Sequence, residues 1–88
     1  MRRIEYSGQF KRDLKRAKKR GKEIAKIKWV ITLLIDGGDI PKALLDHPLK
    51  SNWKDCRDLH IEPDWLLIYR STEDVLRFER TGTHSDLF

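Results

Sequence analysis

The spacing of the apolar residues changes partway along this 88-residue chain, and the change limits the folds that it can adopt. In the first part, apolar residues recur every three or four positions, which is the period of an amphipathic helix. The clearest run is Ile24, Ile27, Val30, Ile31 and Leu34. From about residue 54 onward, apolar residues alternate with polar ones, which is the period of a strand. The chain therefore predicts helices followed by a sheet, in a single α+β domain that covers residues 1–88.

The boundaries of these elements follow from residues that start or stop them. Ser7 can cap a helix with its side-chain oxygen, and Gly21 and Gly37 stand where helices would end. Pro48 restricts His47 to an extended conformation. The expected elements are a strand at residues 2–6, a helix from Ser7 to Gly21, a second helix at 22–35, a helical turn at 42–45, and strands at 54–61, 65–70 and 75–81. This order is βααβββ, with an antiparallel sheet packed on a two-helix hairpin.

Some classes of protein are excluded by what the sequence lacks. A lone cysteine, Cys56, can form neither an internal disulfide nor a thiolate zinc site, so we expect it to be a small core residue. Trp29 and Trp53 are also expected in the core. No apolar run approaches the roughly 20 residues of a membrane span, and the N-terminus lacks the apolar stretch of a secretory signal. We therefore expect a cytoplasmic protein.

Positive charge is concentrated in the N-terminal third of the chain. Residues 1–30 contain 12 lysines and arginines against 3 acids, a net charge of +9, whereas residues 31–88 carry a net charge of −4. The cations are densest at Lys11, Arg12, Lys15, Arg16, Lys18, Lys19 and Arg20. Such a cluster attracts polyanions through counterion release. We expect it to bind nucleic acid, although an acidic protein, an anionic membrane or plain solvent around a helix face would also satisfy this charge.

Three histidines lie in the C-terminal half of the chain, at His47, His60 and His84. Together with Asp64 and Arg80 they supply an acid, a base and a cation, which are the groups needed to cut RNA without a metal. Histidine suits proton transfer because its usual pKa is roughly 6.5, and arginine can contact two phosphate oxygens at once. The chemical alternative is a zinc site, but the spacing gives no close pair of the HxxxH kind and Arg80 would oppose a dication. We therefore expect no metal and no cofactor.

Several blocks of the sequence resemble the signature of YafQ-type toxins, which belong to the RelE superfamily. These blocks are His47-Pro48-Leu49, Trp53-Lys54, the segment from His60 to Tyr69 with the letters EPDW, and the segment from Leu76 to His84 with the letters RTGTH. The resemblance extends over almost the whole chain. It implies a small RelE-like βααβββ fold and a bacterial toxin that cleaves mRNA in the ribosomal A site.

The resemblance also assigns residues to the site. It places His47, His60, Asp64, Arg80 and His84 in the catalytic centre. His84 and one of the other two histidines would transfer protons, and Asp64 would act as a base or orient a histidine. Arg80 is the expected phosphate clamp, lying beside His84. Trp65 and Phe88 match positions that line the family's site and could stack on RNA bases, although Trp65 fits core packing equally well.

The partners implied by the resemblance are a cognate antitoxin, the ribosome with its rRNA, and mRNA. Operator DNA would be contacted only through the antitoxin complex, and no membrane is involved. In this interpretation the basic helices dock on the ribosome and the C-terminal half cuts. Two alternatives remain open, a RelE-fold inhibitor of DNA gyrase and a non-catalytic regulator that binds nucleic acid. Neither alternative needs proton-transfer groups.

Overall fold

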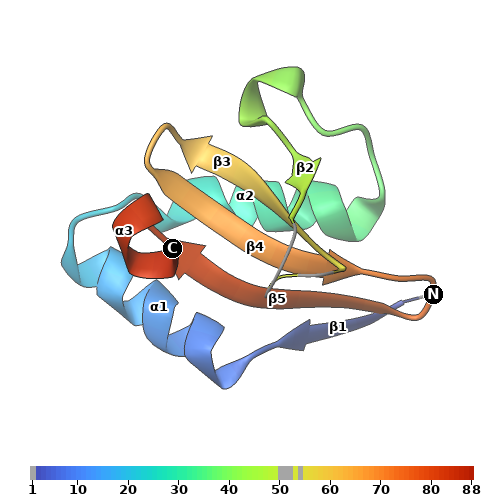
Figure 1. The fold of residues 1–88 in the computed structure, drawn as a ribbon, viewed down its shortest axis with the longest axis horizontal. Helices are drawn as coiled ribbons and strands as arrows, with labels where there is room; N and C mark the ends of the chain where they lie inside the picture. Colours follow the sequence, from blue (N-terminus) through green and yellow to red (C-terminus); the bar gives the residue numbers. More distant parts are fainter. Residues whose placement is uncertain (1, 50–52, 54) are drawn as a thin grey trace.

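A computed structural model describes residues 2–49, 53 and 55–88 of the chain. Its elements are β1 (Arg3–Tyr6), α1 (Gly8–Lys19), α2 (Ile24–Asp36), the 3-10 turn η1 (Lys42–Leu44), β2 (His47–Pro48), β3 (Cys56–Glu62), β4 (Trp65–Ser71), β5 (Val75–Gly82) and α3 (His84–Leu87). The predicted βααβββ elements are all present (Figure 1). The sequence did not predict α3, and it gave β2 only as an extended segment. The start of the predicted third strand at Lys54 lies outside the described residues.

The helix ends follow the predicted stop and start signals. Ser7 caps α1 by accepting a hydrogen bond from the Phe10 N–H, and α2 ends at Gly37, whose φ of 72° is in the left-handed region. Glycine adopts this conformation without a steric penalty. Local sequence therefore accounts for both helices.

The five strands form one sheet in the order β1-β5-β4-β3-β2. The pairs β2–β3, β3–β4 and β4–β5 are antiparallel, as predicted, but β1 pairs with β5 in parallel. The sheet is therefore mixed, and the prediction of a wholly antiparallel sheet was wrong. Parallel neighbours require a crossover connection. Here α1 and α2 carry the chain from β1 at one edge of the sheet to β2 at the other, and β3, β4 and β5 then return it to a position beside β1.

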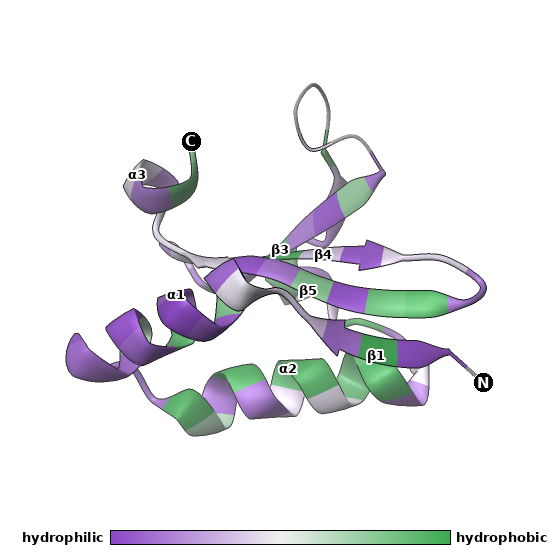
Figure 2. Ribbon diagram, turned by 90° about the horizontal axis from the view of Figure 1, so that it is seen from below, coloured by the Kyte–Doolittle hydropathy of each residue, from purple (hydrophilic) through white to green (hydrophobic). Residues whose placement is uncertain are grey.

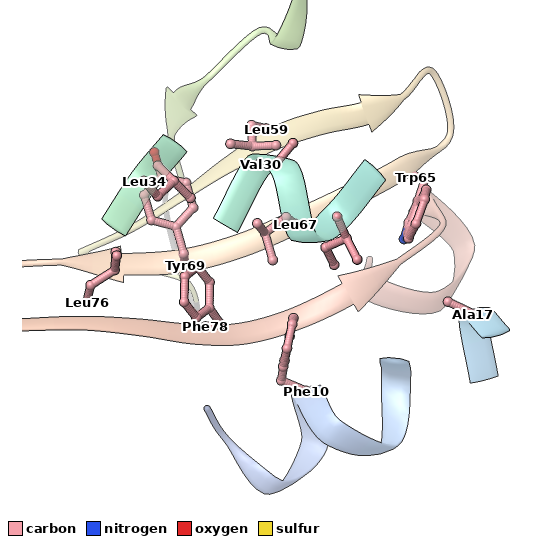
Figure 3. Close-up of a cluster of buried hydrophobic side chains, with 11 residues drawn as sticks. Phe10, Ala17, Val30, Leu34, Leu59, Trp65, Leu67, Tyr69, Leu76 and Phe78 are labelled. Carbon is pink, nitrogen blue, oxygen red and sulfur yellow. The ribbon is translucent and has the colours of Figure 1, made fainter. Parts of the chain in front are cut away.

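Both long helices cover the same face of the sheet (Figure 2). α1 packs mainly on β5 and α2 on β3, on either side of the central β4. Figure 3 shows the core between these layers, with Phe10 of α1 pointing at Phe78 and Val30 of α2 near Leu59. Within the described residues, no helix is both long and apolar enough to cross a membrane.

Of the three residues that were predicted to lie in the core, Cys56 and Trp53 pack in or against a buried cluster, whereas Trp29 does not. Cys56 is buried, as expected, in a smaller cluster on the opposite face of the sheet with Leu66, Ile68 and Leu87, and Trp53 packs against this cluster. Trp29 is 53% exposed, so its predicted place in the core was wrong. It lies between Ile27 and Val30 but off the apolar stripe that these residues form, because neighbouring helix positions point about 100° apart.

Candidate active site

The three histidines converge on the sheet face opposite α1 and α2. His47 lies in β2, His60 lies in β3, and His84 is the first residue of α3. The ring centroids of His47 and His60 are 6.4 Å apart, and those of His60 and His84 are 5.7 Å apart. The fold therefore brings together, in one row, three imidazoles that are 13 and 24 positions apart in sequence.

Asp64 holds the outer histidine at the α3 end of this row. The Nδ1 atom of His84 lies 2.6 Å from Asp64 Oδ1, and the His84 backbone N–H donates to the same oxygen over 2.9 Å. These two hydrogen bonds lower the pKa of the Asp64 carboxyl. Because a carboxylate accepts at Nδ1, that nitrogen carries a proton and Nε2 is left to exchange one.

The histidine at the other end of the row faces two acceptors. His47 Nδ1 donates to the Leu45 carbonyl over 2.7 Å, and His47 Nε2 lies 2.9 Å from Asp58 Oδ1. Burial raises the pKa of the Asp58 carboxyl, and the three nearby histidines oppose this shift only in part. The exposed His47 imidazole thus lies against a buried carboxyl whose pKa is raised.

Asp58 was not predicted as a site residue. It pairs with His47 across β2 and β3, and the two-residue alternation of β3 places it on the same face as His60. A carboxylate on the buried side of a strand next to a histidine was the signal that could have identified it.

Two buried polar atoms at the centre of the row have no directed hydrogen bond among the described residues, namely His60 Nδ1 and Asp58 Oδ1. The 2.9 Å contact of Asp58 Oδ1 with His47 is short enough for an ion pair, but its direction does not satisfy a hydrogen bond. An unsatisfied buried polar group costs about 1–3 kcal/mol. Such groups are rare in native proteins and call for an explanation, of which a substrate partner is one.

The guanidinium of Arg80, which was predicted to clamp a phosphate beside His84, is bound by Asp13 of α1. Arg80 Nε donates to Asp13 Oδ2 over 2.9 Å and Arg80 Nη2 donates to Asp13 Oδ1 over 3.1 Å. The same carboxylate accepts the Thr81 N–H at the edge of β5. Burial alone would raise the pKa of Asp13, but its hydrogen bonds lower it below the usual value. The pair therefore remains ionised.

A bulge in β5 determines which face of the sheet Arg80 occupies. Tyr69 pairs with Phe78, but the next residue back along β4, Ile68, pairs with Arg80, so Glu79 is the extra residue. Arg80 thus lies on the opposite face from Phe78, whereas strict two-residue alternation along the predicted strand at 75–81 would put both residues on one face. Thr81 takes the buried position on the helix side.

Trp65 is a core residue and not a platform for RNA bases. Figure 3 shows its side chain in the cluster of buried hydrophobic residues. Its exposed fraction is 1%, and its indole N–H donates to Thr81 Oγ1 over 2.9 Å. The structure therefore favours the packing interpretation over the predicted base contact. Phe88, the other predicted platform, is 62% exposed at the end of α3, and its contact with a base stays a prediction.

The basic residues of the first helix divide into two groups. One group is exposed on α1 and forms no ion pair within the described part of the chain; it consists of Lys11, Lys15, Lys18 and Lys19. Arg12 donates to Gln9. Arg16 and Arg20 instead form ion pairs with carboxylates of this chain, at Asp86 and, for Arg16, also at Asp13. The four lysines are therefore the cations best placed to meet a polyanion.

The described residues contain no group of three or more histidine, cysteine, aspartate or glutamate side chains placed to hold a metal ion. Each outer histidine instead faces one carboxylate. This arrangement is that of proton-transfer groups with an orienting acid.

Comparison with known proteins identifies the family of this chain. A family model described as the bacterial toxin of a type II toxin–antitoxin system, YafQ, matches residues 2–88. The mRNA interferase toxin YafQ of Escherichia coli strain B / BL21-DE3 is 57% identical over 86 residues, which cover 97% of this chain and 94% of the relative. The crystal structure of YafQ from E. coli BL21(DE3) gives a TM-score of 0.98 at 55% identity, covering 100% of this chain and 99% of the other. The toxin in the crystal structure of the E. coli DinJ–YafQ complex gives 0.95 at 56% identity, with the same coverage. The chain therefore belongs to the YafQ family of toxins of bacterial type II toxin–antitoxin systems.

Proposed function

We propose that this protein is an mRNA interferase that cuts mRNA in the ribosomal A site by metal-independent attack of a 2′-hydroxyl on the scissile phosphate. One observation carries the proposal. Three imidazoles lie in a row on one sheet face, and each outer imidazole faces a carboxylate, Asp58 for His47 and Asp64 for His84. The names of the relatives, which are mRNA interferases, support the same activity.

RNA supplies its own nucleophile, so the enzyme has a short list of tasks. A base removes the proton of the 2′-hydroxyl, the 2′-oxygen bonds to phosphorus, and the bond from phosphorus to the 5′-oxygen breaks as an acid protonates that oxygen. The products are a 2′,3′-cyclic phosphate and a 5′-hydroxyl. These reaction steps use no oxidant, no metal and no cofactor.

The geometry suggests how these tasks are divided. His84 has a free Nε2 because Asp64 holds its Nδ1, so it suits one proton transfer. His47 or His60 performs the other transfer. Asp64 acts by orienting His84. Arg80 has Nη1 left over from its pairing with Asp13, and that atom is the one available to a phosphate oxygen.

Docking on the ribosome would use a part of the chain outside the histidine row, and inhibition by an antitoxin would involve the docking surface or the row itself. The exposed lysines of α1 would contact rRNA phosphates, which compensates for the net charge of −4 in the half of the chain that holds the histidines. The E. coli relative has been solved with DinJ as its antitoxin. We propose that a cognate antitoxin likewise inhibits this toxin, by covering the basic surface or the histidine row.

The test is to incubate the purified protein with programmed ribosomes and, separately, with the same mRNA free in solution, and then to map the cut sites and the end groups. The expected result is cleavage in the A-site codon that yields 2′,3′-cyclic phosphate ends and requires ribosomes. Cleavage of free mRNA alone would contradict the ribosome dependence. Growth inhibition without any RNA cleavage would favour an inhibitor of gyrase or another non-nuclease.

A second arm tests metal independence. Cleavage should persist after the toxin is treated with EDTA and the chelator is exchanged for magnesium buffer before ribosomes are added, so that the ribosomes remain intact. Loss of cleavage that is restored only by a transition metal would contradict the proposed chemistry.

A further inference from the structure

A ladder of alternating charges joins the basic helix α1 to the short helix α3 that begins with His84. Both helices lie at the end of the sheet where β5 ends (Figure 1). Arg20 Nη1 and Nη2 donate to the two Asp86 oxygens over 2.6 and 3.3 Å. Arg16 donates to Asp86 over 3.4 Å and to Asp13 over 3.1 Å. Asp13 in turn holds Arg80. The ladder therefore contacts two of the elements that carry predicted catalytic groups.

Asp86 also determines where α3 starts. Its Oδ2 accepts the Thr83 N–H over 3.0 Å, and Thr83 Oγ1 accepts the Asp86 N–H over 3.1 Å. This reciprocal pair is a capping box, and it fixes the first turn of a helix. His84 is the first residue of that turn, so the orientation of its ring depends on Asp86 as well as on Asp64.

We propose that Asp86 and Arg20 are positioning residues that hold His84 in place by tying α3 to α1. A four-residue helix is too short to be stable alone, so α3 needs an anchor. Leu87 supplies an apolar contact, Asp64 accepts the His84 backbone N–H, and the Arg20–Asp86 pair supplies a charged contact with α1. This inference rests on the proposed function only for its effect on catalysis.

Gly82 is a second observation in favour of the tie. A Cβ atom at this position would lie 2.9 Å from Asp86 Oδ2 and 3.0 Å from Asp86 Cβ, so the Asp86 side chain would have to shift. The glycine of the Thr81-Gly82-Thr83-His84 segment therefore leaves room for Asp86 to fold back onto β5 and reach Arg20.

The crevice between α1 and the start of α3 is nearly filled. Its free volume is about 10 Å³, which is at the lower limit for one water molecule. The two charged groups thus meet directly, and hydrogen bonds from Arg20 and Thr83 hold the pKa of Asp86 well below its usual range. The pair stays ionised at neutral pH.

The proposal changes the role expected for two cations. Arg16 and Arg20 were predicted to bind RNA with the lysines, but their guanidinium groups are occupied within the chain. Replacement of Arg20 should therefore lower the rate at which the ribosome-bound toxin cleaves mRNA. Replacement of Lys18 should instead weaken the binding of the toxin to the ribosome.

The first measurement uses the toxin alone, so it does not depend on nuclease activity. Hydrogen exchange by NMR is followed at the Leu87 and Phe88 amides, which donate to carbonyls of Thr83 and His84 in α3. Exchange should become about tenfold faster in Asp86→Asn and Arg20→Ala. Asp86→Asn keeps an oxygen for the Thr83 cap but loses the charge. Lys28→Ala, which removes an exposed cation from α2, is the matched control and should leave these amides unchanged.

The second measurement separates kcat from KM for programmed ribosomes. Asp86→Asn and Arg20→Ala should lower kcat by about 10- to 100-fold with little change in KM, and Lys18→Ala should raise KM. The conservative variant Arg20→Lys keeps a charged donor for Asp86 and leaves the Thr83 cap intact, so it should recover much of the kcat that Arg20→Ala loses. It also keeps the test decisive if Asp86→Asn or Arg20→Ala unfolds.

Two results would overturn the inference. One is unchanged α3 exchange in both Asp86→Asn and Arg20→Ala. The other is a raised KM with unchanged kcat in Arg20→Ala, which would make Arg20 a docking residue. If the wild-type protein cuts no RNA, the proposed function fails, but the exchange measurement still decides whether the tie exists.

Discussion

One oxygen of Asp64 accepts two hydrogen bonds from His84, over 2.6 Å from the ring Nδ1 and over 2.9 Å from the backbone N–H. The carboxylate comes from the turn after β3, and the histidine begins α3, so a tertiary contact fixes both the tautomer and the position of the imidazole. Nε2 is left to exchange a proton.

This contact predicts a graded loss of activity. His84→Ala should lower kcat by about 10²- to 10⁴-fold because it removes a proton-transfer group. Asp64→Ala should lower it by about 10- to 100-fold, since the ring remains but is no longer oriented. Asp64→Asn keeps an acceptor and should retain more activity than Asp64→Ala. Single-turnover cleavage on programmed ribosomes measures this series, with Asp39→Ala as the exposed control. Equal rates for Asp64→Ala and wild type would show that the contact does not serve catalysis.

Asp13 should make the stability of the protein depend on pH. Its folded-state pKa lies below the usual 3.8, so its carboxylate stabilises the fold above that pH and loses this contribution as the pH falls through the folded-state pKa. Asp13→Asn leaves the Arg80 guanidinium unpaired and should cost about 2–4 kcal/mol at pH 7, which allows for the partial exposure of Arg80.

Urea unfolding of wild type and Asp13→Asn between pH 7 and pH 3 measures this effect. The difference in free energy of unfolding should be largest at pH 7 and should shrink below about pH 4. Asp39→Asn, which changes an exposed acid, should show no comparable trend. A difference for Asp13→Asn that is constant with pH would contradict the ionised Asp13–Arg80 pair.

Trp65 should contribute to stability and not to base recognition. Trp65→Phe removes the hydrogen bond to Thr81 and some core volume, and it should cost about 1–2 kcal/mol. Its cleavage pattern should match that of wild type at a temperature where both are folded. Trp29→Phe, at an exposed position, is the control. A folded Trp65→Phe protein with an altered choice of cut site would restore the predicted base contact.

The exposed lysines of α1 should supply the salt dependence of ribosome binding. Each replacement of Lys11, Lys15, Lys18 or Lys19 by alanine should reduce the slope of log affinity against log salt by about one phosphate contact. Binding is measured by co-sedimentation at several salt concentrations, with Lys28→Ala as the control on the other helix. An unchanged slope in the fourfold variant would place ribosome docking elsewhere on the protein.

Local sequence determined most of the fold. The apolar periods and the Ser7 and Gly37 signals predicted both helices and the three long strands, because these features depend on neighbours within a few residues. The parallel pairing of β1 with β5 depends on which sheet edge is free after the other strands have paired, and periodicity does not carry that information. Trp29 is different, since its position off the apolar stripe would have predicted exposure.

The sequence indicated which residues to consider for the candidate site, but it did not predict their contacts. The family resemblance named His47, His60, Asp64 and His84, and the fold brings these residues together. The pairing of Arg80 with Asp13 was not predictable, because it requires the bulge at Glu79 and the meeting of α1 with the edge of β5. Asp58 was missed because the family resemblance did not name it, although the alternation of β3 places it on the same face as His60.

The most direct test of the proposed chemistry is cleavage of an A-site mRNA that carries a single 2′-deoxy nucleotide at the mapped scissile step. The 2′-hydroxyl is the proposed nucleophile, so this one change should abolish cleavage at that step while ribosome binding of the toxin is unchanged. Cleavage of the deoxy substrate at the normal rate would contradict the account.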